Sequence, residues 1–494
     1  MGMGNWTVGD CLRMSAARWP GKTILKDHRR SVTYEQLDAR VNQVANALGQ
    51  LGLQKGDTCA FMLYNCMELI EVFYGLARAG IVGVPINFRN ASKEIEYLVR
   101  HSDSKALVVG EEFLERITPL VGSCIDPDRV LVVGTETAGR KSYHDYLSKA
   151  SDQAPSVHID GDHVWYIGYT SGTTDNPKGV PTRHRAILEN ATQWLVDYGR
   201  YGEDDRFMLV MPLFHANAIM CSFLMITVGG TLYLHHSGQF DAEEMLGIID
   251  SEKITITSVV PTMLNLILHL PSQVQDKFRR TSVHTILVAS APLWTTIKEG
   301  TLNYFSNTQL FEAYGSTEHQ IVTVLKPKYQ WEKIRSIGKA ITYKEVKLLD
   351  DNGDEVPAGQ PGELYARGWG IPLREYYKDP EGTAKAYRGD WSTVGDIAVM
   401  DAQGFFYLVD RKKDMIISGG ENISPSEIEN QIAKHPAVRE VAVIGQPDEK
   451  WGEAVTAVVA LREGMEASAE DIKACCEGSL ARLVDGTGRD RGEH

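Results

Sequence analysis

The sequence predicts an α/β protein with a large N-terminal domain and a small α+β C-terminal domain. The chain has 494 residues, which is too long for one ordinary hydrophobic core. Short apolar runs alternate with helical patterns along most of its length. Near residue 340 the pattern changes to strict alternation with turn residues. We therefore expect two layered α/β subdomains and a distorted β-barrel over residues 1–410, and a separate unit over residues 411–494.

The N-terminal elements follow from capping and periodicity. Thr33 and Gln36 fit a capping box, and the apolar residues after them recur on one face of a helix. Five short apolar runs, rich in β-branched residues, predict buried strands. These runs begin at Ala106, Val130, Phe207, Ile254 and Thr285. Their alternation with helical segments predicts largely parallel sheets.

The C-terminal elements are of a different kind. Residues 344–368 alternate between apolar and polar side chains and carry turn signals, which predicts a β-meander or barrel. Ser424, Pro425 and Glu427 suit the N-cap, N1 and N3 positions of a helix. Residues 438–446 then predict a strand. This tail is typical of a small α+β unit.

Composition narrows the classes of protein to consider. The formal net charge of −14 disfavours nucleic acid or an anionic membrane surface as the main partner. No run of about 18 apolar residues occurs, so we expect no membrane-spanning helix. The seven cysteines are scattered without a CxxC pair, and the N-terminus lacks an apolar signal-peptide core. These features predict a cytoplasmic chain with reduced thiols and no zinc site.

One loop combines the groups that bind phosphate. Residues 169–179 read YTSGTTDNPKG and follow the apolar run VWYIG. Such a composition is usually a surface turn. Here, however, glycines allow close backbone approach, hydroxyls add donors, and Lys178 adds a positive charge. We predict a phosphate-binding loop. It is not a Walker A loop, because Pro177 precedes Lys178 where that motif has glycine.

Four further stretches accompany this loop in order: MPLFHANA, FEAYGSTEH, WSTVGD and LVDRKKD. Together they resemble the adenylate-forming superfamily of acyl-CoA synthetases, luciferases and peptide-synthetase adenylation domains, up to about residue 480. The resemblance implies an AMP-forming acid–CoA ligase. A carboxylate would attack the α-phosphate of ATP, acyl-AMP would form with loss of pyrophosphate, and a CoA thiol would take the acyl group. ATP, Mg²⁺ and CoA are the implied cofactors.

The resemblance also implies which residues bind ATP. The β- and γ-phosphates would be held by Thr170, Ser171, Gly172, Thr173, Thr174 and Lys178. The adenine and α-phosphate would lie against Tyr314, Gly315 and Thr317. Glu318 would ligate Mg²⁺. Asp396 and Arg411 would contact the ribose, although an ion pair at a domain edge is the simpler explanation of these two residues.

The same resemblance implies the remaining catalytic and thiol-binding residues. His215 would line the acyl pocket and gate the carboxylate, although a lone histidine in an apolar run is more often a core residue. Lys413 would lie at the hinge about which a mobile C-terminal domain rotates between the two half-reactions. Gly419 and Gly420 would border the tunnel for the thiol, where the alternative is a simple turn.

The sequence departs from the family pattern at several positions. Asp175 replaces a usual glycine in the phosphate loop, Val394 replaces a common threonine, and Asp410 replaces a common glycine. The family normally continues to a lysine that bridges the carboxylate and the α-phosphate, whereas this chain ends in a polar tail, LVDGTGRDRGEH. We expect that tail to be disordered and truncated. Adenylation is then expected to be slow, while thioester formation from a supplied acyl-adenylate survives.

Three alternatives remain open from the sequence. An amino-acid adenylation domain that loads a carrier protein would place an acidic residue in the run HANAIMCSF, which has none. A non-catalytic adenylate-binding protein would retain the nucleotide residues without turnover. A luciferase would share the same motifs. The ligase interpretation is favoured, with an aryl, alicyclic or short-to-medium acyl acid, ATP and CoA as small-molecule partners; a homodimer is not decided by the sequence.

Overall fold

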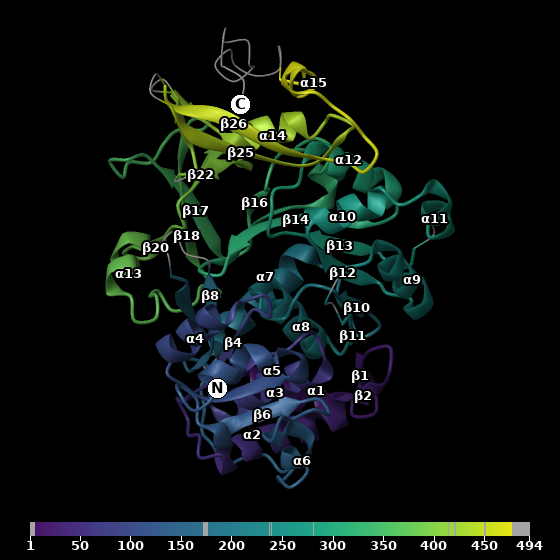
Figure 1. The fold of residues 1–494 in the computed structure, drawn as a ribbon, viewed down its shortest axis with the longest axis vertical. Helices are drawn as coiled ribbons and strands as arrows, with labels where there is room; N and C mark the ends of the chain where they lie inside the picture. Colours follow the sequence, from purple (N-terminus) through teal and green to yellow (C-terminus); the bar gives the residue numbers. More distant parts are fainter. Residues whose placement is uncertain are drawn as a thin grey trace.

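The computed structural model describes residues 5–170, 176–236, 238, 240–279, 281–412, 414–418, 421–448 and 451–476. Within these ranges the strands form four sheets. Figure 1 shows β4 and β6 of the first sheet low in the molecule, β12, β13 and β14 of the second sheet at mid-height, and β25, β26 and α14 at the top. No helix of the described ranges is both long and apolar enough to cross a membrane.

The first sheet has seven described strands in the order β7-β6-β5-β3-β4-β8-β9. Five of the six described pairings are parallel, and the pairing of β8 with β9 is antiparallel. The strands are Thr58–Met62 (β3), Val82–Pro85 (β4), Ser104–Gly110 (β5), Val130–Val133 (β6), Lys141–Ser142 (β7), Val164–Thr170 (β8) and Lys178–Arg183 (β9). The apolar runs at Ala106 and Val130 are thus confirmed as buried parallel strands.

The second sheet has nine strands in the described part, in the order β16-β15-β14-β13-β12-β10-β11-β1-β2. The strands at its centre pair in parallel, which confirms the buried strands predicted from the apolar runs at Phe207, Ile254 and Thr285. The strands are Thr23–Lys26 (β1), Ser31–Thr33 (β2), Arg206–Leu209 (β10), Thr231–Leu234 (β11), Ile256–Val259 (β12), Thr285–Val288 (β13), Gln309–Ser316 (β14), Gln320–Leu325 (β15) and Lys339–Ala340 (β16).

Buried helices join these two sheets into one core. α2 (Tyr34–Gln50) begins with the predicted capping box of Thr33 and Gln36. It packs on α3 (Met67–Ala79), all of whose residues are buried. A Cβ on Gly75 of α3 would lie 2.3 Å from Cγ1 of Val44 on α2, so only glycine permits this close approach. The other larger helices are Val8–Arg18 (α1), Ser92–His101 (α4), His184–Tyr198 (α7), Ala216–Val228 (α8), Ala242–Glu252 (α9), Pro261–Leu268 (α10) and Thr295–Tyr304 (α12).

The third sheet is antiparallel and has a small core of its own, including Tyr314, Leu364 and Phe406. It confirms the predicted change of pattern after residue 340. Its described strands are Lys344–Leu349 (β17), Pro361–Gly368 (β18), Tyr387–Arg388 (β19), Trp391–Ser392 (β20), Asp396–Met400 (β21) and Phe406–Arg411 (β22). α13 (Pro380–Ala386) precedes β19.

The C-terminal sheet, in the order β24-β23-β26-β25, also has a separate core that includes Ile416, Ile428 and Val443. The strands are Ile416–Ser418 (β23), Glu421–Ile423 (β24), Val438–Asp448 (β25) and Gly452–Leu461 (β26), with helices Pro425–Ile432 (α14) and Ala469–Ala474 (α15). The α+β tail is confirmed, whereas the boundary between residues 410 and 411 stays a prediction. The expected C-terminal disorder concerns residues 483–494, which lie outside the described ranges.

Candidate functional site

Thr170 and Lys178, at the two ends of the predicted phosphate loop, belong to two paired strands. β8 and β9 run antiparallel, and Thr170 at the end of β8 is paired with Lys178 at the start of β9. This pairing brings the hydroxyl and the ammonium group to the same end of the sheet. The other predicted residues of the loop, Ser171, Gly172, Thr173 and Thr174, lie outside the described residues, as does Asp175.

A tight reversal between β14 and β15 presents Thr317 and Glu318. β14 ends at Ser316 and β15 begins at Gln320, and the two strands pair antiparallel. A Cβ on Gly315 would lie 2.1 Å from the carbonyl oxygen of Gln320, so this position admits only glycine. The predicted Gly315 is therefore needed for the backbone geometry, and the nucleotide role assigned to it stays a prediction.

Contacts between distant segments bring the loop end and this reversal together. A Cβ on Gly168 of β8 would lie 3.2 Å from Cγ2 of Thr317, so the two segments touch. The Lys178 ammonium lies 4.7 Å from the ring centroid of Tyr376. The Tyr376 hydroxyl donates a hydrogen bond of 3.0 Å to Oε1 of Glu318. Thus Tyr376 joins the predicted phosphate residue Lys178 to the predicted metal ligand Glu318.

Tyr376 was not among the predicted site residues. The sequence around it, REYYKDP, shows only two adjacent tyrosines before the helix start at Asp379 and Pro380. That pattern indicates a helix start rather than a binding site. Tyr376 is buried, and its pKa is raised by burial and by the Glu318 carboxylate, so its hydroxyl remains a donor at neutral pH.

The surroundings of Glu318, the predicted magnesium ligand, are compatible with that prediction. Its carboxylate is buried, and Tyr376 orients one of its two oxygens. The described ranges contain no group of three or more His, Cys, Asp or Glu side chains that could hold a metal. Mg²⁺ commonly takes only one or two protein carboxylates together with substrate phosphates and water. A single buried carboxylate beside a phosphate-binding loop therefore fits magnesium.

A second cluster joins Tyr314 to Asp396 and Arg411. The Tyr314 hydroxyl donates a hydrogen bond of 2.6 Å to Oδ2 of Asp396. Asp396 and Arg411 are directly opposite on β21 and β22, and Nε of Arg411 lies 3.5 Å from Oδ1 of Asp396. Burial raises the pKa of Asp396, and the Tyr314 hydrogen bond and the Arg411 charge partly offset that effect. The structure brings these three predicted residues together.

His215 forms the N-cap of α8, and its side chain is exposed. It is therefore not a core histidine. Its ring packs on Phe214 with centroids 4.4 Å apart. Desolvation of the ring by neighbouring side chains and the nearby Arg89 charge lower the pKa of His215 below its usual value, so the ring is neutral at pH 7. A neutral, accessible imidazole is compatible with the predicted role in the acyl pocket.

Asp410 connects the third sheet to the C-terminal unit. The predicted helix start at Ser424 is confirmed, but the Ser424 hydroxyl makes no capping bond and donates instead to the carbonyl of Val409 at 2.7 Å. Asp410 supplies the cap, because its Oδ2 accepts from the backbone N–H of Ser426 at 3.0 Å. The predicted hinge residue Lys413 and the predicted tunnel residues Gly419 and Gly420 lie outside the described residues.

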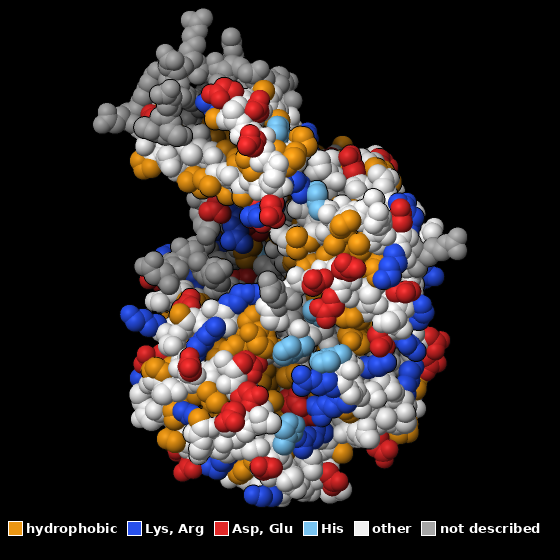
Figure 2. Space-filling view, turned by 45° about the vertical axis from the view of Figure 1, so that its right-hand side comes forward, with side chains coloured by type: hydrophobic (Ala, Val, Ile, Leu, Met, Phe, Trp, Pro, Cys, Tyr) orange, Lys and Arg blue, Asp and Glu red, His pale blue; other side chains and the backbone are white. Residues whose placement is uncertain are grey.

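Figure 2 shows a hollow between the C-terminal part at the top and the main body below, with Lys and Arg side chains visible inside it. The site residues come from segments on the body side: β8, β9, the β14–β15 reversal and β21. Cations at this position suit a polyanionic substrate, although the whole chain carries a net charge of −14.

Comparisons with known proteins agree with this geometry. Residues 12–377 match the family model described as AMP-binding enzyme, and residues 427–485 match that of the AMP-binding enzyme C-terminal domain. A feruloyl-CoA synthase of an Amycolatopsis species is 33% identical over 482 residues, covering 97% of this chain and 93% of that protein. The long-chain-fatty-acid–CoA ligase FadD13 of Mycobacterium tuberculosis is 35% identical over 456 residues, covering 91% and 87%.

A solved structure matches almost the whole fold. The o-succinylbenzoate CoA synthetase MenE of Bacillus subtilis, in complex with ATP and magnesium ion, superposes with a TM-score of 0.83 at 26% identity. The match covers 96% of this chain and 94% of that one. The three matched proteins differ in the acid that their names specify, so the comparisons agree on the reaction and differ on the acyl group.

Proposed function

The chain belongs to the AMP-binding enzyme family, and from this premise we propose that it joins CoA to a neutral aryl, alicyclic or short-to-medium-chain carboxylic acid. The activity is that of an AMP-forming acyl-CoA ligase that uses ATP, Mg²⁺ and CoA. The carboxylate attacks the α-phosphate, acyl-AMP forms and pyrophosphate leaves. The CoA thiol then attacks the acyl carbon, and AMP is released.

The two half-reactions bring several negative charges together, so positioning and charge stabilisation are the main tasks of the site. We assign the β- and γ-phosphates to Lys178 and Thr170, which face each other across β8 and β9. Thr317, which touches β8 at Gly168, would donate to the α-phosphate. Tyr376 contacts both Lys178 and Glu318, so the predicted phosphate residue and the predicted metal ligand lie close together, and this supports the assignment.

Glu318 is assigned to magnesium, with Tyr376 holding its carboxylate in place. A bound Mg²⁺ would neutralise phosphate charge, and Glu318 would be the residue that holds it. Asp396 is assigned to the ribose, because a carboxylate can accept from both hydroxyls of the sugar. Tyr314 and Arg411 orient that carboxylate from two sides.

The observation that carries the acyl assignment is the composition of α8. The helix reads ANAIMCSFLMITV and offers no carboxylate to pair with a substrate amine. At its start, the Asn217 side-chain oxygen already accepts from Ser258 at 3.2 Å and from Cys221 at 3.3 Å. This absence supports a neutral acid over an amino acid.

Packed aromatic rings limit the room beyond α8. Trp194 and Tyr198 have ring centroids 5.0 Å apart, and Tyr198 and Phe311 are 4.9 Å apart. All three side chains are buried. If the acyl group binds beside α8, these closely packed rings favour a short or planar group over a long chain, because a long chain would have to disrupt their packing.

The test is AMP and thioester release with Mg-ATP, CoA and a panel of benzoates, cinnamates, cyclic acids and C2–C18 fatty acids. We expect turnover with one of the compact classes. Trp194→Ala is then expected to move the preference toward larger acids, while the matched surface change Trp331→Ala leaves it unchanged. A preference for C16 or longer acids in the unaltered enzyme would contradict the assignment.

Two further assignments are proposals of the same kind. The C-terminal unit, with its own core, is proposed to rotate about the segment near Lys413, although that residue lies outside the described ranges. A cytoplasmic location is proposed because the seven cysteines are scattered along the chain without a CxxC pair. The oligomeric state stays a prediction.

A further inference from the structure

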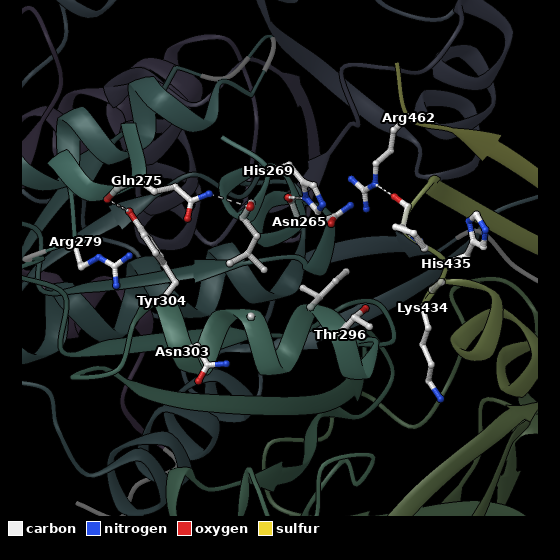
Figure 3. A pocket seen from close by; sticks show the side chains of 15 residues that line it. Asn265, His269, Gln275, Arg279, Thr296, Asn303, Tyr304, Lys434, His435 and Arg462 are labelled. Atoms are coloured by element: carbon white, nitrogen blue, oxygen red, sulfur yellow. Dashed lines mark hydrogen bonds between the residues drawn. The ribbon is translucent and has the colours of Figure 1, made fainter. Parts of the chain in front are cut away.

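A cavity of about 560 Å³ lies between the second sheet's helices and the C-terminal unit. One wall comes from α10, α12 and the short helix Ser272–Lys277 (α11) with the residues after it, and the other from residues 433–436 and Arg462. Figure 3 shows the Arg462 guanidinium directed toward the space into which Asn265 and His269 also point. None of the residues assigned to the nucleotide lines this cavity.

The lining is positively charged. It includes Arg279, Lys434 and Arg462, together with His269 and His435, and it includes no Asp or Glu. The Lys434 ammonium donates to Oε1 of Gln431 at 2.6 Å and points away from Arg462 in Figure 3, so Lys434 adds positive charge at the border rather than a direct ligand. This is notable in a chain whose formal net charge is −14. The nearest carboxylates act from outside the lining: Asp276 pairs with Arg279 at 3.0 Å, and Asp471 interacts with His435.

Arg462 lacks a compensating anion within the described residues. Its Nε donates to the carbonyl of Pro436 at 3.0 Å, and no described carboxylate lies within ion-pair distance. The side chain is half-buried, and that burial lowers its pKa from the ordinary value. A desolvated guanidinium gains more from an anionic ligand than an exposed one, and its planar fork matches phosphate oxygens.

The remaining lining suits a phosphorylated molecule larger than a lone ion. Leu268, Ile297 and Tyr304 supply apolar surface. The Tyr304 hydroxyl donates a hydrogen bond of 3.0 Å to the carbonyl of Gln275. The side chain of Asn265 adds an amide at the edge of the cavity. A lining that combines cations with apolar surface suits an organic phosphate.

We propose that this cavity is a second, non-catalytic binding site for a compound that carries two or more phosphate groups. The ligase reaction offers two sources of that chemistry, the pyrophosphate that it releases and the phosphorylated nucleotide end of CoA. Because the walls belong to the main body and to the C-terminal unit, an occupant holds both in their present arrangement. The proposal does not depend on which acid is the acyl substrate.

The test is calorimetric titration of the full chain with inorganic pyrophosphate. We expect two binding events, one at the Lys178 site and one in the cavity. The double variant R462Q/K434Q should weaken only the second event, by roughly tenfold or more, because charged hydrogen bonds to phosphate are lost. Lys178→Met should remove only the first. Lys149→Gln, an exposed lysine far from both groups in sequence, serves as the matched control.

Circular dichroism shows whether each variant is folded, and the single variant Arg462→Gln is used if the double variant is not. A single binding event that R462Q/K434Q leaves unchanged overturns the proposal, whatever the enzyme's turnover. The two sources are distinguished by competition. Displacement of pyrophosphate from the cavity by adenosine 3′,5′-bisphosphate, but not by pantetheine, identifies the CoA nucleotide as an occupant; no displacement identifies pyrophosphate.

Discussion

Tyr314 and Asp396 are joined by a hydrogen bond of 2.6 Å from the phenolic hydroxyl to Oδ2 of the carboxylate. The bond links β14 of the second sheet to β21 of the third sheet, 82 residues apart in the chain. Both side chains are buried, and Arg411 approaches the other carboxylate oxygen. The bond therefore fixes the Asp396 carboxylate at the seam between two sheets.

Asp396→Asn is expected to weaken ATP binding by about tenfold to a hundredfold, because charged hydrogen bonds to the ribose are replaced by neutral ones. The measurement is the KM for ATP together with direct titration of AMP. Tyr314→Phe is the matched control, since it keeps the carboxylate and removes only its orienting donor. We expect a smaller loss from that variant. Equal ATP affinity in Asp396→Asn and the unaltered enzyme would refute the ribose assignment.

Glu318→Gln is expected to lower the adenylation rate by roughly 10- to 100-fold and to raise the Mg²⁺ concentration needed for half-maximal activity. The amide keeps the shape of the side chain but binds a hard cation poorly. The measurement is pyrophosphate exchange as a function of magnesium. Glu299→Gln, on the exposed face of α12, is the control. An unchanged magnesium dependence would show that Glu318 is not a ligand.

Lys178→Met is expected to slow adenylation by about 100- to 1,000-fold, because one charge donor to the phosphates is removed. Thioester formation from a supplied acyl-adenylate has no β- or γ-phosphate and should change little. The two half-reactions are measured separately by pyrophosphate exchange and by thioester release. Lys178→Arg should recover part of the rate. If both half-reactions fell equally, Lys178 would have a structural role.

Lys344 makes the free energy of unfolding depend on pH. Its side chain is buried, Nζ donates to the carbonyl of His319 at 2.8 Å, and burial lowers its pKa from 10.5 to about 7. The nearby Glu189 charge opposes this shift only partly. Between pH 7 and 10.5 the unfolded chain holds a proton that the folded chain has lost, so this group makes stability rise with pH.

The measurement is chemical unfolding at several pH values between 7 and 10, with Lys344→Met as the comparison. We expect the unaltered chain to gain up to about 4 kcal/mol relative to the variant across this window, at about 1.4 kcal/mol for each unit of pKa shift. Lys385→Met, an exposed lysine, controls for general loss of charge. Parallel stability curves for the chain and Lys344→Met would contradict the lowered pKa.

Asp410→Ala is expected to destabilise the start of α14 by about 1 kcal/mol, because the N–H of Ser426 loses its cap. Hydrogen exchange of the amides in α14 measures this effect locally. Asp410→Asn keeps an acceptor and should retain most of the protection. The result that would count against this account is equal protection of α14 in the alanine variant and the unaltered chain.

Local signals in the sequence were sufficient for the elements. The Thr33 capping box, the apolar runs from Ala106 to Thr285 and the start of α14 at Ser424 depend on residues only a few positions apart. Such signals act through short-range sterics and backbone hydrogen bonds, which a short stretch carries within itself. The five motifs, from YTSGTTDNPKG to LVDRKKD, likewise identified the family, because each is a short stretch that can be found without knowing the fold.

What the sequence by itself determined is therefore the fold class and the ligase family, and it also predicts which residues meet the nucleotide. Only the tertiary structure decided which distant side chains touch. Tyr376 reaches Glu318 across 58 residues, and Asp410 rather than Ser424 caps α14. Arg462 meets α10 only where the C-terminal unit packs on the main body. These contacts depend on the packing of whole sheets and helices against one another, and no local pattern encodes that arrangement.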